Sequence, residues 1–108
     1  DEVISQVMAE RALGLTTKRV VEESKMSGAP GAATSIFKLV GSSLTKSGSA
    51  LKSQLRGTAG LVWDSEEFDQ DELDSTRSWL RDRAVTIYGG TNEVQQNIIA
   101  KRVLGLPD

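Results

Sequence analysis

Apolar residues recur three or four positions apart in four separate stretches of this chain, and no stretch alternates apolar with polar residues. A spacing near 3.6 residues is typical of amphipathic helices, whereas strands need a period of two. The chain is therefore predicted to be all-α. Most of the connections are short, which favours an antiparallel four-helix up-down bundle. The predicted helices cover residues 1–25, 33–56, 70–88 and 92–104.

The last predicted helix is marked at both ends. Gly89 and Gly90 can take positive φ and let another molecule approach the backbone, and Thr91 can cap the helix through its hydroxyl. At the far end, Gly105 suits a residue just past a helix and Pro107 prevents continuation. A two-glycine corner that opens a helix leaves free N–H groups, which favour an anion such as phosphate. A bare interhelical turn is the alternative.

The other helices carry weaker signals. Small residues such as Gly41 and Gly48 lower the intrinsic helicity of the second helix, but they allow a neighbouring helix to lie close. A Gly- and Pro-containing break follows the first helix at residues 27–31. Residues 61–63 are expected to form a buried connector. The acidic run after them resembles a metal site, but Asp69 with Glu72 is more typical of an N-cap pair.

Composition narrows the chemistry. The 108 residues contain no cysteine and no histidine, so disulfides, thiolate metal sites and the commonest general base are absent. With a net charge of −2, the chain lacks the excess of positive charge that is typical of nucleic-acid-binding proteins. No apolar run is long enough to cross a bilayer, and a cytoplasmic protein is expected. Because the chain opens with Asp1 inside a helical pattern, we expect an upstream part of a longer polypeptide.

The segment IYGGTNEVQQNIIAKRVLGLP, residues 87–107, closely resembles the C-terminal signature of the acyl-CoA dehydrogenase family. The resemblance implies a helical domain that mediates tetramer contacts, here without its first helix and without the N-terminal and middle domains. It also implies an FAD-dependent flavoprotein of fatty acid metabolism that oxidises acyl-CoA to 2,3-enoyl-CoA. Electrons would pass to an electron-transfer flavoprotein. The isolated segment is expected to be inactive and to self-associate through apolar surface.

The resemblance assigns roles to residues at the two-glycine corner. Gly90 matches the position whose backbone lies against the substrate thioester. Thr91, Asn92 and Glu93 match residues that contact the flavin nucleotide, and their hydroxyl, amide and N–H groups suit phosphate and ribose oxygens. Arg77, Arg81 and Arg83 share the polar side of the third predicted helix and could simply be solvated; if a cofactor or CoA phosphate lies nearby, one of them could face it.

A second family pattern, Q-x-x-G-G-x-G, falls on residues 54–60. In the family it meets FAD from a neighbouring subunit, which implies cofactor contacts at Gln54, Gly57 and Thr58. Thr58 stands where a glycine is usual, so the pattern is only partly matched.

The catalytic base is missing from its commonest place. Many family members carry a glutamate at the position of Gly89, and a glycine cannot take the α-proton of an acyl-CoA. Some members carry the glutamate on an earlier helix instead. No catalytic residue is therefore assigned within the 108 residues. An acyl-CoA oxidase-like flavoenzyme and a non-catalytic flavin-binding or structural subunit remain alternatives.

Overall fold

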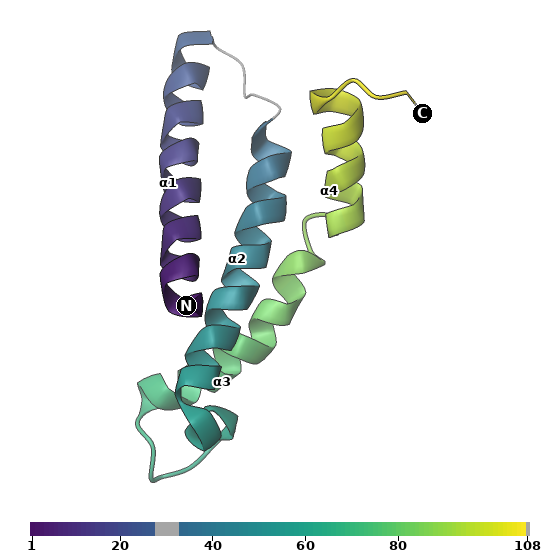
Figure 1. Ribbon diagram of the computed structural model, residues 1–108. Coiled ribbons are helices and arrows are strands. Elements are labelled where there is room, and N and C mark those ends of the chain that lie inside the picture. Colours follow the sequence, from purple (N-terminus) through teal and green to yellow (C-terminus); the bar gives the residue numbers. More distant parts are fainter. Residues whose placement is uncertain (28–32, 108) are drawn as a thin grey trace.

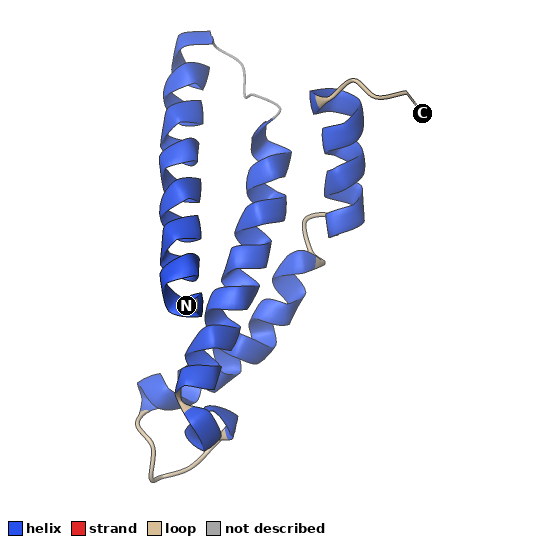
Figure 2. Cartoon of the chain, viewed as in Figure 1, coloured by secondary structure: helices blue, strands red, loops and turns tan. Residues whose placement is uncertain are grey.

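The computed structural model describes residues 1–27 and 33–107, and all regular structure in those ranges is helical (Figure 2). The all-α prediction is confirmed, and the main helices overlap the predicted ranges. The predicted break at residues 27–31 lies almost wholly outside the described residues. The elements are α1 (Glu2–Ser27), α2 (Ala33–Leu55), the 3-10 helix η1 (Gly57–Leu61), α3 (Gln70–Arg81), the 3-10 helix η2 (Asp82–Thr86), α4 (Asn92–Ile98) and the π-helical turn η3 (Ile99–Val103).

α2 is the helix on which the other elements assemble. α1 runs antiparallel to it on one side, and α3, η2 and α4 follow one another along another side (Figure 1). α3 and α4 both run antiparallel to α2, so α4 continues the direction of α3. This arrangement places the start of α4 beside the N-terminal half of α2, and η1 at the C-terminal end of α2.

The small residues of α2 form its contact with α1, as the sequence predicts. A Cβ at Gly41 would lie 3.7 Å from Leu13 Cδ2, and one at Gly48 would lie 3.0 Å from Gln6 Nε2. Gln6 also crosses the contact with hydrogen bonds, because its Nε2 donates to Leu44 O at 2.9 Å and its Oε1 accepts from Ser47 Oγ at 2.7 Å. The two helices are thus held by close approach and polar bonds more than by large apolar side chains.

The apolar stripe of α1 faces away from α2. Its residues are exposed in the structure, with 58% of the surface of Val7 and 67% of Met8 accessible. Leu73 is the one large apolar residue classed as buried among the described residues. The accessible surface of 7732 Å² exceeds the ~5,800 Å² expected of a compact protein of this mass. The radius of gyration of 17.3 Å likewise exceeds ~13 Å.

The third predicted helix differs in its last turn and a half. It is α-helical only to Arg81 and then tightens into η2. At this end of the helix, Lys38 of α2 donates from Nζ to Val85 O at 2.8 Å. The Ala84 carbonyl accepts from both Ile87 N at 2.9 Å and Tyr88 N at 3.1 Å, which is a mixed 3-10 and α turn.

The prediction of a buried connector at residues 61–63 is wrong. Leu61 is 71% exposed and Trp63 is 56% exposed. No described element covers this side of the chain. The ring of Trp63 instead meets the Arg77 guanidinium at 5.6 Å, and Arg77 Nη2 donates to Trp63 O at 3.3 Å.

Candidate functional site

Gly89 and Gly90, called the glycine corner below, connect η2 to α4. Their φ angles are +69° and +100°, in the region that side chains with a Cβ rarely adopt, as the sequence predicts. Thr91 then caps α4, because its Oγ1 accepts from the Val94 N–H at 3.4 Å. The predicted roles of the two glycines and of the cap in shaping this turn are confirmed.

The corner is braced by side chains from two helices. Gln95, which is only 6% exposed, donates from Nε2 to Gly89 O at 3.1 Å. From the other side Lys38 lies against the corner, and a Cβ at Gly89 would meet its Cε at 3.3 Å. The Lys38 ammonium is also 5.8 Å from the centre of the Tyr88 ring. The backbone of the corner is therefore fixed relative to both α2 and α4.

Asn92 and Glu93 follow the corner at the first turn of α4. Asn92 Oδ1 is buried and has no hydrogen-bond partner among the described residues. A buried acceptor without a donor is costly, so this atom suits a ligand hydroxyl or N–H. The Glu93 backbone N–H and the Thr91 hydroxyl hold the pKa of the exposed Glu93 carboxyl below its usual range. Its charge is stabilised, so the group is a poor proton acceptor.

The second set of predicted residues lines a groove at the C-terminal end of α2, called the α2–η1 groove. Its volume is about 480 Å³. Gly57 opens η1 with φ +58°, and nothing lies within 4 Å of where its Cβ would be. Across the groove Arg83 stacks on Trp79, with 5.0 Å between the guanidinium carbon and the ring centre. The lining residues are Ala50, Ser53, Gln54, Gly57, Thr58, Leu61, Trp79 and Arg83.

η1 is fastened to α2 and α3 through the Gly60 carbonyl. Ser53 Oγ of α2 donates to this oxygen at 3.0 Å, and Thr76 Oγ1 of α3 donates to it at 3.1 Å. Both hydroxyl-bearing residues are buried, with 7% of Ser53 and 3% of Thr76 accessible. A Cβ at Gly60 would collide with the Ser53 carbonyl oxygen. The floor of the α2–η1 groove therefore depends on a small residue and two hydroxyls.

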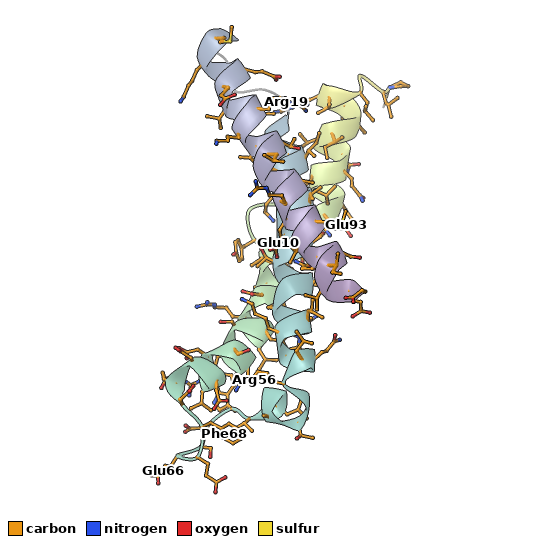
Figure 3. All side chains as sticks on the ribbon, turned by 60° about the vertical axis from the view of Figure 1, so that its left-hand side comes forward. Glu10, Arg19, Arg56, Glu66, Phe68 and Glu93 are labelled. Atoms are coloured by element: carbon orange, nitrogen blue, oxygen red, sulfur yellow. The ribbon has the colours of Figure 1, made fainter. Side chains whose placement is uncertain are left out.

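The structure does not bring the two sets of predicted residues together. Lys38, beside the glycine corner, and Gln54, in the α2–η1 groove, are 16 positions apart on α2, or about 24 Å along its axis. Figure 3 shows Arg56, which follows α2, in the lower part of the molecule and Glu93 of α4 well above it. One chain thus carries two separate candidate contact regions.

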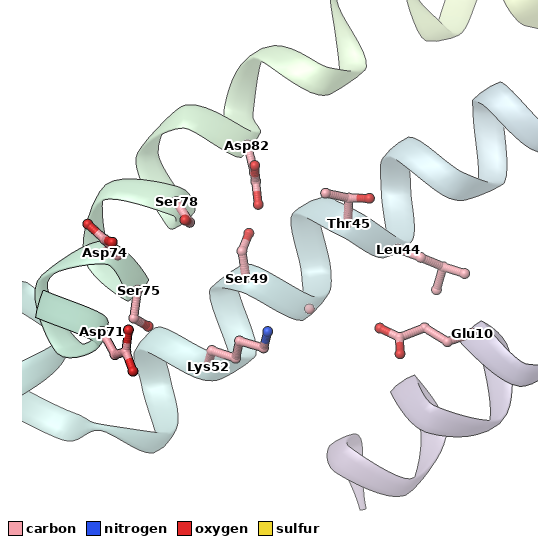
Figure 4. Close-up of a pocket in the computed structure, with 11 residues that line it drawn as sticks. Glu10, Leu44, Thr45, Ser49, Lys52, Asp71, Asp74, Ser75, Ser78 and Asp82 are labelled. Atoms are coloured by element: carbon pink, nitrogen blue, oxygen red, sulfur yellow. The ribbon is translucent and has the colours of Figure 1, made fainter.

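A third groove has a different character. It has a volume of about 520 Å³ between α1, α2 and α3, and it contains none of the predicted site residues (Figure 4). The carboxylates of Glu10, Asp71, Asp74 and Asp82 face it, with Lys52 as the one cation among its lining residues. This charge disfavours phosphate-bearing ligands. Asp69 and Glu72 form a capping box at the start of α3, which confirms their N-cap interpretation. No group of residues suited to a metal ion occurs among the described residues.

Three residues that shape these regions were not predicted as site residues from the sequence. Gln95 and Lys38 hold the glycine corner, and Trp79 forms one wall of the α2–η1 groove. For Lys38 a signal existed, since it is a charged residue inside an apolar stretch, whereas Gln95 has mostly polar neighbours in the sequence. Trp79 lies next to the predicted stripe of α3, and only the fold shows what it faces.

The chain is similar in sequence to known proteins of one family. The model of the family described as "Acyl-CoA dehydrogenase, C-terminal domain" matches residues 2–104. The chain is 55% identical over 53 residues to acyl-CoA dehydrogenase IpdE1 of Mycolicibacterium smegmatis, and 53% identical over 51 residues to IpdE1 of Mycobacterium tuberculosis.

These matched segments cover 49% and 47% of this chain but only 12% of each relative, so the chain spans a small part of their length. No solved structure matches the chain significantly. Within the described residues, none of the helices has the length and apolar character needed to cross a membrane. The match over nearly all its residues, together with the helical fold, places the chain in the acyl-CoA dehydrogenase family as a C-terminal domain.

Proposed function

We propose that this chain is the C-terminal part of an FAD-dependent acyl-CoA dehydrogenase that oxidises an acyl-CoA to the 2,3-enoyl-CoA. The observation that carries the proposal is the family match over residues 2–104, which includes the glycine corner. Gly89 is exposed and Gly90 is half-buried, so the backbone of the corner is accessible to another molecule, as the proposed contact with an acyl thioester requires.

The residues at the start of α4 fit a flavin nucleotide. The unpartnered Asn92 Oδ1 needs a donor, and a ribityl or ribose hydroxyl is a suitable one. Thr91 and Glu93 add a hydroxyl and a carboxylate on the same turn. In the α2–η1 groove, Gln54, Gly57 and Thr58 would hold the adenine side of a flavin bound mainly by a neighbouring subunit. When bound, FAD supplies the acceptor for the substrate hydride.

The proton acceptor of this reaction lies outside the 108 residues in our proposal. Gly89 has no side chain, and Glu93 is held as a stabilised carboxylate on α4. In the proposed enzyme, a glutamate on an earlier helix removes the α-proton, as in those family members that carry it there. The role of this chain is then to position the thioester through Gly90 and to hold the flavin.

The surface of the domain supports a multimeric enzyme. α1 presents Val3, Ile4 and Met8 on the face away from α2, and such a surface favours burial against other protein. We propose a homo-oligomer, a tetramer in full-length form, that is cytoplasmic and passes electrons to an electron-transfer flavoprotein.

A second candidate is a non-catalytic flavin-binding or oligomerisation subunit, and Gly89 at the usual base position is the observation that favours it. An oxidase-like enzyme that delivers electrons to oxygen is a variant of the first proposal. It would differ in consuming oxygen without an added electron acceptor.

Visible absorption of the polypeptide expressed from the complete reading frame tests these alternatives. We expect a flavin spectrum that one member of an acyl-CoA panel bleaches under anaerobic conditions. A flavin spectrum that no acyl-CoA bleaches would favour the non-catalytic subunit. A colourless protein would refute the cofactor assignments at Thr91, Asn92 and Glu93.

A further inference from the structure

Gln95 is a buried polar residue, and the cofactor and substrate roles proposed above do not use it. Its side chain is 6% exposed and reaches back from α4 to donate to the Gly89 carbonyl at 3.1 Å. Buried amides normally satisfy such bonds with partners that are fixed by secondary structure. Here the acceptor is the carbonyl of the peptide that joins Gly89 to Gly90. This peptide lies outside regular secondary structure, so no helical hydrogen bond fixes it.

The bond decides how that peptide is oriented. A trans peptide is planar, so its carbonyl and its N–H point in opposite directions. With the Gly89 carbonyl held toward Gln95, the Gly90 N–H points away from Gln95. No backbone carbonyl accepts a hydrogen bond from the N–H of Gly89 or Gly90 in the described part of the chain. The Gly90 N–H is therefore left without a backbone partner and points away from Gln95.

Glycine makes this control necessary. Residues without a Cβ move between left- and right-handed regions at little cost, so the peptide between Gly89 and Gly90 has no intrinsic preference for one orientation. Lys38 fixes the end of η2 through Val85 O, but its bond is four residues before the corner. Gln95 alone bonds to the corner peptide itself among the described side chains.

We propose that Gln95 is a positioning residue that fixes the Gly89 carbonyl and so aims the Gly90 N–H at the carbonyl oxygen of an acyl thioester. This inference rests on the proposed function, since it presumes that the corner faces acyl-CoA. Gln95 does not touch the substrate in this scheme and acts only through the backbone.

The test compares two ligands on the full-length flavoprotein. An enoyl-CoA has the thioester carbonyl, and the matching S-alkyl-CoA thioether lacks it. Each is titrated while the flavin absorbance is followed, with Gln95→Met as the variant and Gln96→Met, at an exposed neighbouring position, as the control. Gln95→Met should lower the affinity for the enoyl-CoA thioester by about three- to ten-fold, which is the effect of one neutral hydrogen bond. The affinity for the thioether should stay unchanged.

An equal loss of affinity for both ligands, or no change in the affinity for either, would overturn the inference while leaving the proposed function intact. If neither ligand perturbs the flavin of the unaltered protein, the proposed function fails and the inference falls with it. Flavin content reports whether Gln95→Met folds. Should that variant lose its flavin, Gln95→Glu replaces it, because the carboxylate keeps the shape of the side chain without an N–H donor.

Discussion

The Gly60 carbonyl gives the sharpest prediction about how the α2–η1 groove is maintained. It accepts one hydroxyl from Ser53 at 3.0 Å and one from Thr76 at 3.1 Å, and Gly60 is buried. A carbonyl oxygen has two lone pairs, so both bonds can form at once. Removing either hydroxyl leaves the oxygen with one partner, whereas removing both leaves a buried acceptor with none.

The magnitudes follow from that difference. Ser53→Ala and Thr76→Val should each cost about 1 kcal/mol, the usual net value of one hydrogen bond. The double variant should lose both bonds and also suffer the desolvation penalty of an unsatisfied carbonyl, a further ~1–3 kcal/mol. We therefore expect the double variant to be less stable than the sum of the single variants, with a coupling of about 1–3 kcal/mol.

Native-state hydrogen exchange of the full-length flavoprotein, followed by mass spectrometry, measures this locally. Protection of residues 57–63 should fall about five-fold in each single variant and by a hundred-fold or more in the double variant. Ser43→Ala and Thr45→Val are the matched controls, since both residues are exposed and bond only within α2. Strict additivity in the double variant would refute the shared-acceptor reasoning.

Three further predictions concern other parts of the chain. Asp69→Ala removes the capping box of α3 and should cost about 1 kcal/mol in urea unfolding, more than the neighbouring Asp71→Ala. Gly90→Ala places a Cβ 2.5 Å from Gln95 Nε2 at a residue with φ +100°. Bleaching of the flavin by acyl-CoA should therefore slow at least ten-fold in this variant. In the control Gly105→Ala, whose new Cβ meets no neighbour, the flavin should bleach at the normal rate. Because the pKa of Glu93 is lowered from 4.5 on folding, its contribution to stability is present above that pH and is lost as the pH falls. Glu93→Gln should accordingly flatten the acid limb of a stability profile below pH 4.5, and an unchanged profile would contradict this.

The local features of the fold were predictable because their causes lie within a few residues. The cap at Thr91, the capping box of Asp69 with Glu72, and the left-handed glycines all follow from side-chain reach and from the absence of a Cβ. The close contact between α1 and α2 was also predictable, since a run of small residues can serve little else in a helix.

The features that could not be predicted depend on contacts distant in sequence. Lys38 bonds to the Val85 carbonyl from 47 positions away, and no local sequence feature near Val85 indicates this contact. The exposure of Leu61 and Trp63 depends on which element covers them, and apolar composition alone suggested burial. In the candidate site, the sequence motif was enough to identify the corner residues. The hydrogen bond from Gln95 to the corner could be found only from the folded structure.

The separation of the two contact regions bears on how a complete site would be assembled. The glycine corner lies beside the N-terminal half of α2, and the α2–η1 groove lies about 24 Å further along the same helix. Because α2 is rigid, a single chain cannot bring the two regions closer. In the proposed homo-oligomer, a flavin would take its corner contacts from one copy and its groove contacts from another, so cofactor binding would itself depend on a second subunit.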